Sequence, residues 1–326
     1  MRKTSLLILS MIFIVLCFFT TTSAIHVFES DWEMPTSIKE SQSAYRLVLI
    51  TQDIDTPFWD QVGRAAEREA KKLGVSLEVW GNYGGHQEDF LKNLEVAIQS
   101  KVDGIIVQGL DSEDFKELTK VKASFYGIPI MTIANDVPIE ESLRRTYVGS
   151  DHYKAGELIA KQMLADMGDT GDVVLMFNRN VEYYQEQRIA GIKAVLQDYE
   201  QITIHYAGTS NTREDMVAVT QEVLNQVPQA NAFIAVNANS AGAIVQEISK
   251  RYQVEPFYIY SFDEGPESLS LLRQGALNAI IQQSPEQMGK QSVDLLTKWL
   301  NGEVVPLDTD GYLTDIHVLK AAAFYE

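Results

Sequence analysis

The stretch Arg46–Trp80, RLVLITQDIDTPFWDQVGRAAEREAKKLGVSLEVW, sets the pattern for most of this chain. It begins with a short run rich in Val, Leu and Ile, residues 46–51, which predicts a buried parallel strand. Pro57 then stands at a first helical position, where its missing N–H costs nothing, and Gly74 is placed to end the helix. A second strand begins at Val75, so the stretch predicts a strand–helix–strand unit with a right-handed crossover.

The loop between this strand and its helix, residues 52–59, is the first candidate binding segment. Ligands of parallel sheets bind in the crevice beyond the carboxyl ends of the strands. The loop carries amides, carboxylates, a hydroxyl and the two aromatic rings of Phe58 and Trp59. These groups can contact a small polar molecule, so we expect the ligand site to include them.

Composition and charge narrow the class of protein. A chain of 326 residues suggests about two domains. Its 45% hydrophobic and 22% charged residues are typical of a folded globular protein. The net charge of −18 argues against nucleic acid as a partner, because phosphate binding needs a basic surface. The single cysteine, Cys17, lies in the hydrophobic N-terminus, so we expect no disulfide and no thiol chemistry in the folded part.

Residues 1–24 have the composition of an export or anchoring segment. Arg2 and Lys3 precede an almost unbroken apolar run, residues 6–19, and small residues follow as far as Ala24. This layout predicts either a signal peptide cleaved after Ala24 or an uncleaved anchor, since about 20 apolar residues span a bilayer. In both cases the basic residues precede the span, so we expect the rest of the chain in the periplasm or on the outer face of the cytoplasmic membrane.

The next segment, residues 25–44, is polar and shows no sustained period, which indicates a tether. Leu16 stands directly before Cys17, where a lipoprotein signal needs a small residue. Membrane proximity is therefore expected through the N-terminal segment itself and not through a lipid.

From Tyr45 onward, strands and helices alternate. Strands are expected at 46–51, 75–80, 104–108, 129–133 and 146–149 in a first series, and at 173–177, 202–206, 232–236, 257–262 and 277–282 in a second. This alternation predicts the α/β class with doubly wound parallel sheets. Two consecutive series predict two similar lobes, joined near residues 148–150.

Short motifs along the chain resemble those of type I periplasmic sugar-binding proteins. That group holds receptors for ribose, galactose, allose and xylose, and the effector domains of lactose-repressor-type regulators. The resemblance runs from Tyr45 to the C-terminus. Its carriers are Thr56-Pro57-Phe58-Trp59, Lys101-Val102-Asp103-Gly104-Ile105-Ile106-Val107, Gly127-Ile128-Pro129-Ile130, Val148-Gly149-Ser150-Asp151, Ala155-Gly156, Gln187-Arg188-Ile189-Ala190-Gly191, Asn237-Ala238-Asn239, Ser261-Phe262-Asp263 and Gln282-Gln283-Ser284-Pro285. Each motif is weak alone, whereas their order and spacing together are specific.

The resemblance implies a type I periplasmic binding protein fold, in which two doubly wound lobes are joined by a three-strand hinge. The N-terminal lobe would comprise residues 45–149 and 284–311. The C-terminal lobe would comprise residues 150–283 and 312–326. The ligand would be one monosaccharide, a pentose or a hexose, bound between the lobes.

The resemblance also implies the ligand-binding residues. A sugar offers apolar C–H faces to aromatic rings, and hydroxyls to amides, carboxylates and guanidinium groups. Matched position by position, the implied set is Thr56, Phe58, Trp59, Asn135, Asp136, Arg188, Asn237, Asp263 and Gln283. Thr56 stands where relatives often carry Asn. Ala134 stands where ribose receptors carry an acidic residue, which argues against ribose as the ligand.

Ordinary structural roles stay open for these residues. The two aromatic rings could be simple packing at a helix start. Arg188 could form a surface ion pair with Glu182 or Glu186, and Asp263 could cap the helix that follows it. Asn178 and Asn180 lie on the same side of the crevice, where we expect ordinary loop residues.

Catalysis finds little support in the sequence. The five histidines show no metal-ligand spacing. The chain has no GxSxG elbow, Walker loop or dinucleotide-binding glycine fingerprint. We therefore expect no enzyme, no metal and no other cofactor. A lactose-repressor-type regulator would need a helix-turn-helix before residue 45, where the hydrophobic segment stands instead.

Two functions remain open. The first is a solute-binding protein that presents its closed form to a sugar ABC permease. The second is a membrane-anchored sugar sensor, for example for xylose, that signals through the extracellular domain of a histidine kinase. A cleaved signal peptide favours the first function, and an uncleaved anchor without a lipidation cysteine favours the second.

Overall fold

A computed structural model of the chain describes residue 11 and residues 13–22, 45–83, 86–210, 212–251 and 257–324. Residues 13–22 are helical, whereas the expected tether and the expected cleavage site after Ala24 lie outside the described residues. Among the described helices, none combines the length and apolar character needed to cross a membrane. Contacts divide the chain into residues 1–43 and 44–326, and the second unit holds both sheets.

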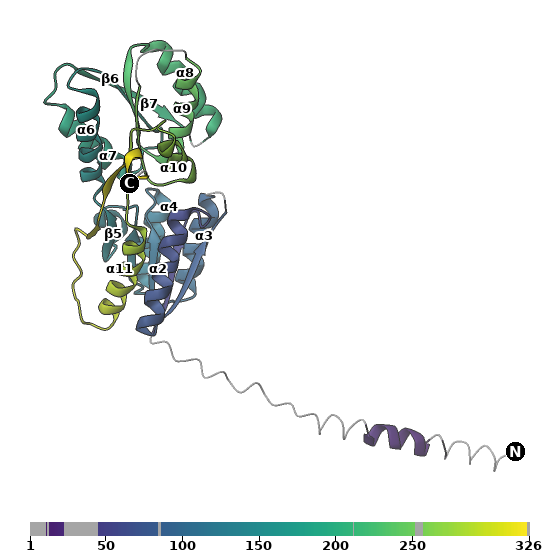
Figure 1. Ribbon diagram of the computed structural model, residues 1–326. Coiled ribbons are helices and arrows are strands. Elements are labelled where there is room, and N and C mark those ends of the chain that lie inside the picture. Colours follow the sequence, from purple (N-terminus) through teal and green to yellow (C-terminus); the bar gives the residue numbers. More distant parts are fainter. Residues whose placement is uncertain are drawn as a thin grey trace. The chain divides into compact units, whose positions relative to one another are not determined.

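The first sheet has six strands in the order β11-β5-β4-β3-β1-β2, and all of its neighbouring strands run parallel (Figure 1). Its strands are β1 (Arg46–Thr51), β2 (Ser76–Gly81), β3 (Gly104–Gln108), β4 (Ile130–Ile133), β5 (Thr146–Ser150) and β11 (Tyr312–Thr314). Its helices are α2 (Pro57–Leu73), α3 (Gln87–Gln99), α4 (Glu113–Lys116), the π-helix η1 (Glu117–Ala123), α5 (Ile139–Ser142) and α11 (Pro285–Leu300).

The second sheet repeats this arrangement in the order β12-β10-β9-β8-β6-β7. Only the β10–β12 pair is antiparallel among its described strands. The strands are β6 (Gly171–Asn178), β7 (Ile202–Thr209), β8 (Ala230–Ala235), β9 (Tyr258–Phe262), β10 (Ala279–Gln282) and β12 (His317–Lys320). The helices are α6 (His152–Met167), α7 (Tyr183–Leu196), α8 (Arg213–Gln226), the 3₁₀ turn η2 (Ala238–Ser240), α9 (Ala241–Ser249), α10 (Pro266–Arg273) and the 3₁₀ turn η3 (Ala321–Phe324).

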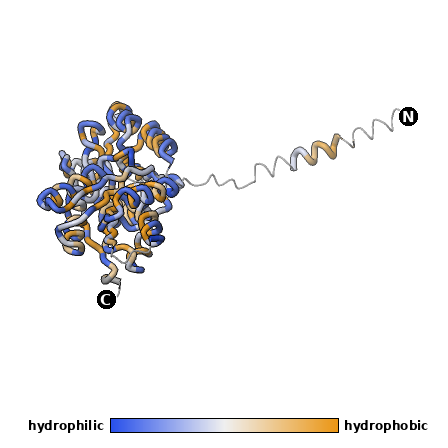
Figure 2. The backbone as a smooth tube through the Cα atoms, turned by 90° about the horizontal axis from the view of Figure 1, so that it is seen from above, coloured by the Kyte–Doolittle hydropathy of each residue, from blue (hydrophilic) through white to orange (hydrophobic). Residues whose placement is uncertain are grey.

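Each sheet has an apolar core on both faces. One cluster of the first sheet includes residues of α2 and α11, and the other includes residues of α3, α4 and η1. The second sheet is covered in the same way by two further clusters. Figure 2 shows many hydrophilic residues along the outer helices. Burial on both faces explains why the strands consist of continuous apolar runs, and it confirms the doubly wound α/β class.

The chain passes between the sheets three times, as expected for a three-strand hinge. It leaves the first sheet at the end of β5, returns after β10, and leaves again between β11 and β12. We expected the last boundary between residues 311 and 312. The structure differs, because Tyr312 pairs with Val148 and β11 therefore extends the first sheet as far as Thr314. From this strand pairing we propose that the boundary between the lobes lies after Thr314.

Helix α2 begins and ends for the reasons that its sequence suggests. Thr56 is the N-cap, and its Oγ1 accepts a hydrogen bond from the backbone N–H of Trp59 at 3.3 Å. Pro57 follows in the first helical position. Gly74 ends the helix with φ +70°, a left-handed conformation that glycine adopts without strain. These caps fix where the aromatic pair of the following turn lies.

Helices α6 and α7 approach each other closely through two glycines. A Cβ atom on Gly156 would overlap the carbonyl oxygen of Arg188, and one on Gly191 would overlap the carbonyl oxygen of Tyr153. Such backbone-to-backbone packing has no room for a methyl group. Gly156 therefore determines how α7, and with it Arg188, lies against α6.

We expect Gly156→Ala to lower the free energy of unfolding by about 1–3 kcal/mol, since overpacking forces the two helices apart. Urea denaturation monitored by circular dichroism measures this change. The matched control is Gly63→Ala in α2, where the new Cβ would lie 3.5 Å from Val79 Cγ1, an ordinary contact. That control should be neutral or stabilising by up to about 1 kcal/mol because Ala favours helix. Equal midpoints for the two variants would contradict the prediction.

Candidate functional site

A cavity of about 260 Å³ lies at the carboxyl ends of strands from both sheets. We call it the smaller cavity. Seven of the nine expected site residues line it: Thr56, Phe58, Trp59, Asn135, Asn237, Asp263 and Gln283. The structure thus brings together residues that are up to 227 positions apart in the chain (Gln283 minus Thr56). Arg188 and Asp136 do not line it.

The two aromatic residues of α2 have different surroundings. Their rings meet edge to face, with centroids 5.3 Å apart. Trp59 is buried in the core cluster that covers the sheet, whereas Phe58 packs against that cluster and stays half-buried. Phe58 is therefore the ring more open to a ligand, and Trp59 supports it from behind. Packing at the helix start is confirmed for Trp59, and contact of Phe58 with a ligand stays a prediction.

Arg188 is a buried residue with 1% of its surface exposed. Its Nη1 and Nη2 each donate a hydrogen bond of 3.0 Å to a different carboxylate oxygen of Asp263. Nη1 also donates to the carbonyl oxygen of Val236 at 2.8 Å. The guanidinium carbon lies 5.0 Å from the ring centre of Tyr184 and 4.4 Å from that of Phe262. Arg188 therefore holds Asp263 from behind, and the surface ion pair considered from the sequence is not formed.

Asp263 lines the smaller cavity with its carboxylate partly exposed. Its backbone is left-handed, with φ +69°, a region that Asp tolerates better than most residues. The helix that follows is capped by Gly265 and Ser268, not by the Asp263 side chain. Gln283 donates its amide N–H to Asp263 Oδ1, and Gln283 Oε1 accepts from Ser150 Oγ at 2.7 Å. These contacts link the acidic group to two of the three chain crossings.

Asn237 follows β8 in the same cavity. Its Nδ2 donates to Asn178 Oδ1 at 3.1 Å, and its Oδ1 accepts from Ser240 Oγ at 3.4 Å. Asn178 is the last residue of β6, so the pair joins two neighbouring strand ends. Asn178, expected to be an ordinary loop residue, is thus a fixed part of the site.

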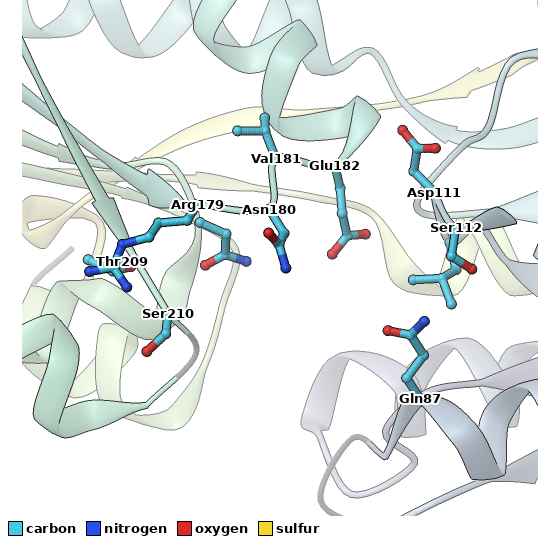
Figure 3. Close-up of a pocket in the computed structure, with 11 residues that line it drawn as sticks. Gln87, Asp111, Ser112, Arg179, Asn180, Val181, Glu182, Thr209 and Ser210 are labelled. Carbon is cyan, nitrogen blue, oxygen red and sulfur yellow. The ribbon is translucent and has the colours of Figure 1, made fainter.

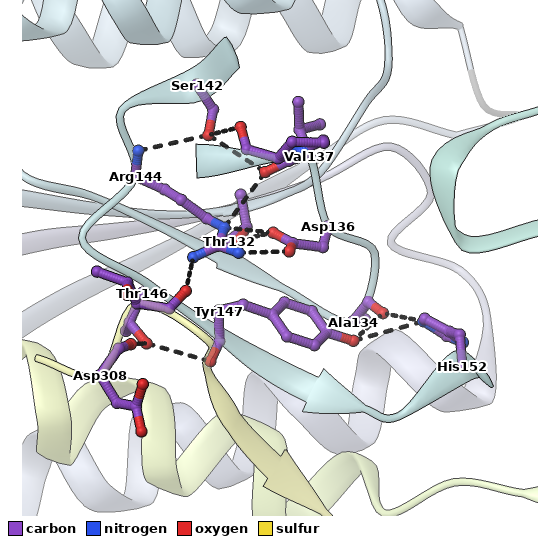
Figure 4. A network of polar contacts seen from close by, with 12 residues as sticks. Thr132, Ala134, Asp136, Val137, Ser142, Arg144, Thr146, Tyr147, His152 and Asp308 are labelled. Carbon is purple, nitrogen blue, oxygen red and sulfur yellow. Dashed lines mark hydrogen bonds and ion pairs between the residues drawn. The ribbon is translucent and has the colours of Figure 1, made fainter. Parts of the chain in front are cut away.

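Asp136 lies away from the cavity, in a buried polar network (Figure 4). Its Oδ1 is 2.6 Å from Arg144 Nε and accepts from Thr132 Oγ1, also at 2.6 Å, while Oδ2 accepts from Arg144 Nη2 at 2.7 Å. Burial raises the pKa of this carboxyl, and Arg144 opposes the rise. Both oxygens are occupied within the protein, so the structure gives Asp136 a role in shaping the loop that carries Asn135 and does not support its expected ligand contact.

Two residues at the first chain crossing, Tyr147 and His152, connect the site to the loop after β4. The Tyr147 hydroxyl donates to the carbonyl oxygen of Ala134 at 2.9 Å (Figure 4). It also lies 3.0 Å from the carbonyl oxygen of Ser150. His152 accepts from Arg188 Nε at Nδ1, 3.3 Å away, so its Nε2 carries the proton and donates to Ala134 at 2.9 Å. Burial, followed by the charge of Arg188, lowers the pKa of His152 to about 3. The imidazole is therefore neutral and links Arg188 to the loop after β4.

Sequence reasoning missed several residues of this site. Gln108 and Tyr184 line the smaller cavity, and His152 contacts Arg188. Gln108 ends β3, and the rule that ligands bind beyond the carboxyl ends of parallel strands would have found it. Tyr184 precedes Arg188 by one helical turn, a spacing that also predicts contact. No spacing rule singles out His152. Within the described part of the chain, no group of three or more His, Cys, Asp or Glu side chains is arranged to hold a metal ion.

Comparison with known proteins agrees with this geometry. A model of the periplasmic binding protein domain matches residues 47–303. The ribose import binding protein RbsB of Bacillus subtilis strain 168 is 22% identical over 276 residues, which cover 84% of this chain and 88% of the relative.

Two solved structures extend the comparison. GanP, a glucose-galactose binding protein from Geobacillus stearothermophilus, is 28% identical with a TM-score of 0.79, covering 85% of this chain and 98% of that one. A XylFII-LytSN complex contains a chain that is 26% identical with a TM-score of 0.73 at the same coverage. Both likenesses extend over both sheets.

Arg188→Ala should lower the free energy of unfolding by about 1–3 kcal/mol, because it leaves the Asp263 carboxylate without its bidentate donor. Arg188→Lys should recover part of this loss, since lysine restores the charge but not the planar fork. Denaturant titrations give the values. Arg64→Ala is the control, as the exposed Arg64–Asp60 pair should contribute at most about 0.5 kcal/mol. An Arg188→Ala variant as stable as the control would refute the structural role.

The low pKa of His152 predicts a loss of stability in acid. The unfolded imidazole takes up a proton near pH 6.5 while the folded one does not until about pH 3. Stability from this group is therefore complete above pH 6.5 and falls as the pH decreases towards 3, by up to about 1.4 kcal/mol per pH unit. His152→Gln should flatten the decline of thermal midpoint between pH 6.5 and 4. A His317→Gln control at an exposed site should keep the wild-type slope; identical slopes for both variants would exclude the mechanism.

Proposed function

This chain belongs to the periplasmic binding protein family, and on that premise we propose that it is an extracytoplasmic sugar receptor. It binds a monosaccharide, a pentose or a hexose, in the smaller cavity and presents the closed form to a sugar ABC permease. The relatives named above bind ribose or glucose and galactose by their names, which supports a sugar as the ligand class.

One observation carries this proposal. The smaller cavity combines an accessible ring from one sheet, Phe58, with a firmly held carboxylate from the other, Asp263. A sugar ring presents C–H groups on its face and hydroxyls around its edge, and these two residues complement the two kinds of surface. Asn135, Asn237 and Gln283 add amides that can both donate to and accept from hydroxyls.

We propose binding without catalysis at this site. Both carboxylate oxygens of Asp263 accept hydrogen bonds from Arg188, so the guanidinium balances the charge of this carboxylate. A general acid or base needs a group that exchanges a proton at working pH. The pair is instead suited to hold a fixed array of hydrogen-bond acceptors against a polyhydroxy ligand.

Closure of the two lobes is the output of binding in this proposal. The residues that contact the ligand come from both sheets, and only three chain segments connect the sheets. Contacts from both sides are complete only when the lobes approach each other, so the ligand shifts the population towards the closed form. A partner can then recognise the closed shape without contacting the sugar.

A second candidate is a membrane-anchored sensor that passes the closed form to the extracellular domain of a histidine kinase. The observation that favours it is the likeness to the chain in the XylFII-LytSN complex, a relative solved together with a second protein. Retention of residues 1–24 as an anchor in the exported protein separates this candidate from the transport receptor.

Calorimetry with D-xylose, D-arabinose, D-allose, D-glucose and D-galactose should show 1:1 binding with a Kd below about 1 mM for at least one of them. Small-angle scattering should show the radius of gyration falling by about 1 Å with that sugar, a modest hinge closure. Phe58→Ala should abolish both signals because the accessible ring is lost. Phe125→Ala, which removes a ring that is 82% exposed and does not line the cavity, is the control. Absence of binding to every monosaccharide would reject the proposal.

A further inference from the structure

A second and larger cavity, of about 610 Å³, is lined by the residues drawn in Figure 3. Gln87, Asp111 and Ser112 contribute to it from the first sheet's loops and helices, and Asn180 and Glu182 contribute from the loop after β6. None of the residues implied by the family resemblance lines this cavity. Its role therefore needs an explanation of its own.

Neighbouring residues connect the two cavities. Leu110 lines the larger cavity, and Gln108, at the end of the preceding strand, lines the smaller one. At the start of α7, Glu182 lines the larger cavity and Tyr184 lines the smaller one. Asn178 lines the larger cavity and accepts the hydrogen bond from Asn237, which lines the smaller. The two spaces are thus consecutive parts of one crevice between the strand ends.

The larger cavity contains polar side chains that have no partner inside the protein. Gln87, Asn180 and Glu182 make no side-chain hydrogen bond or ion pair with any described residue. Figure 3 shows Gln87 extending from one side and Asn180 and Glu182 from the other, towards the space between them. Glu182 is half-buried, and a half-buried polar group normally finds a partner, so its carboxyl group points to a ligand that supplies one. Gln87 and Asn180 are exposed at the rim of the cavity, where the same ligand can reach them.

The charges in the cavity limit what this ligand can be. Asp111 pairs with Lys116 at 2.8 Å, and Arg179 pairs with Asp215 at 3.1 Å, so neither is a free charge. Burial, with a smaller contribution from Asp111, raises the pKa of Glu182 to about 7. Two carboxyl groups near each other disfavour an anion, and a lining of amides and hydroxyls disfavours an apolar group. A polyhydroxy ring, which donates and accepts at every hydroxyl, matches these side chains.

We propose that the larger cavity is a second sugar subsite, so that the ligand is a disaccharide or glycoside with one ring in each cavity. This inference rests on the proposed function, which assigns the first ring to the smaller cavity. The size of the crevice agrees with it: typical ligand pockets measure about 300–1,000 Å³, a range that the smaller cavity alone does not reach. Asn180 and Glu182, from one lobe, and Gln87, from the other, then select the second ring.

The experiment compares each monosaccharide with disaccharides that contain it. Isothermal titration calorimetry on the exported chain should use D-glucose with cellobiose and maltose, D-galactose with lactose and melibiose, and D-xylose with xylobiose. At least one disaccharide should bind about 10-fold more tightly than its component monosaccharide, as expected from additional hydrogen bonds. Binding should remain 1:1, since both rings belong to one ligand.

Variants then test whether the higher affinity for the disaccharide comes from the larger cavity. The double variant Asn180→Ala with Glu182→Gln should lower the disaccharide affinity about 10-fold and change monosaccharide affinity less than about 2-fold. Glu186→Gln, an exposed carboxylate on the same helix, is the matched control and should change neither. Circular dichroism and the unchanged monosaccharide affinity verify that each variant is folded.

The outcomes separate this inference from the function on which it rests. If monosaccharides bind and every disaccharide binds equally or more weakly, the second subsite is excluded and the receptor function stands. If the double variant reduces both affinities by the same factor, the larger cavity has no separate role and the inference is overturned. If no saccharide binds, the proposed function fails, and the subsite fails with it.

Discussion

The paired hydrogen bonds between Arg188 and Asp263 are the interaction on which the site depends. Removing a guanidinium from water carries a large desolvation cost, and the pair is stable only because every polar atom is satisfied. Asp263, the carbonyl oxygen of Val236 and the ring nitrogen of His152 meet these needs, and two aromatic rings enclose the cation. Few arrangements satisfy so many groups together. The pair therefore fixes the loop after β9 against the start of α7.

The same pair connects the site to the hinge. From Arg188 the contacts continue through His152 to the carbonyl oxygen of Ala134, which follows β4 of the other sheet. From Asp263 they continue through Gln283 to Ser150 at the first chain crossing. Both routes end on segments that must turn when the lobes move. If a ligand contacts Asp263, as we propose, hydrogen bonds connect that contact to the hinge.

Local signals in the sequence predicted the fold, and the family resemblance predicted seven residues that line the smaller cavity. Apolar runs, caps and alternation define the strands and helices. Asn237 and Asp263 follow β8 and β9, so their place in one cavity agrees with binding beyond the carboxyl ends of parallel strands. The sequence alone could not show that Asn135 lines the cavity while Asp136 does not. Which way each of two adjacent loop residues points depends on the backbone conformation, which the sequence pattern does not specify. The partner of Asp136, Arg144, is eight positions away, and no sequence motif joins the two residues. The larger cavity could not be predicted from the sequence, because its polar residues form no motif and come together only in the folded chain.

The discontinuous first lobe has a consequence for biosynthesis. Its core includes Met288, Val293, Leu295 and Leu296 of α11, and its sheet ends with β11, both encoded near the end of the chain. During translation, the helical layer formed by α2 and α11 therefore lacks its α11 half until nearly the whole polypeptide has been made. Domains fold as units once their sequence is complete. The order of segments in this chain thus delays completion of the first sheet's core, and a late-completed core keeps that part of the polypeptide open to a secretion channel for longer.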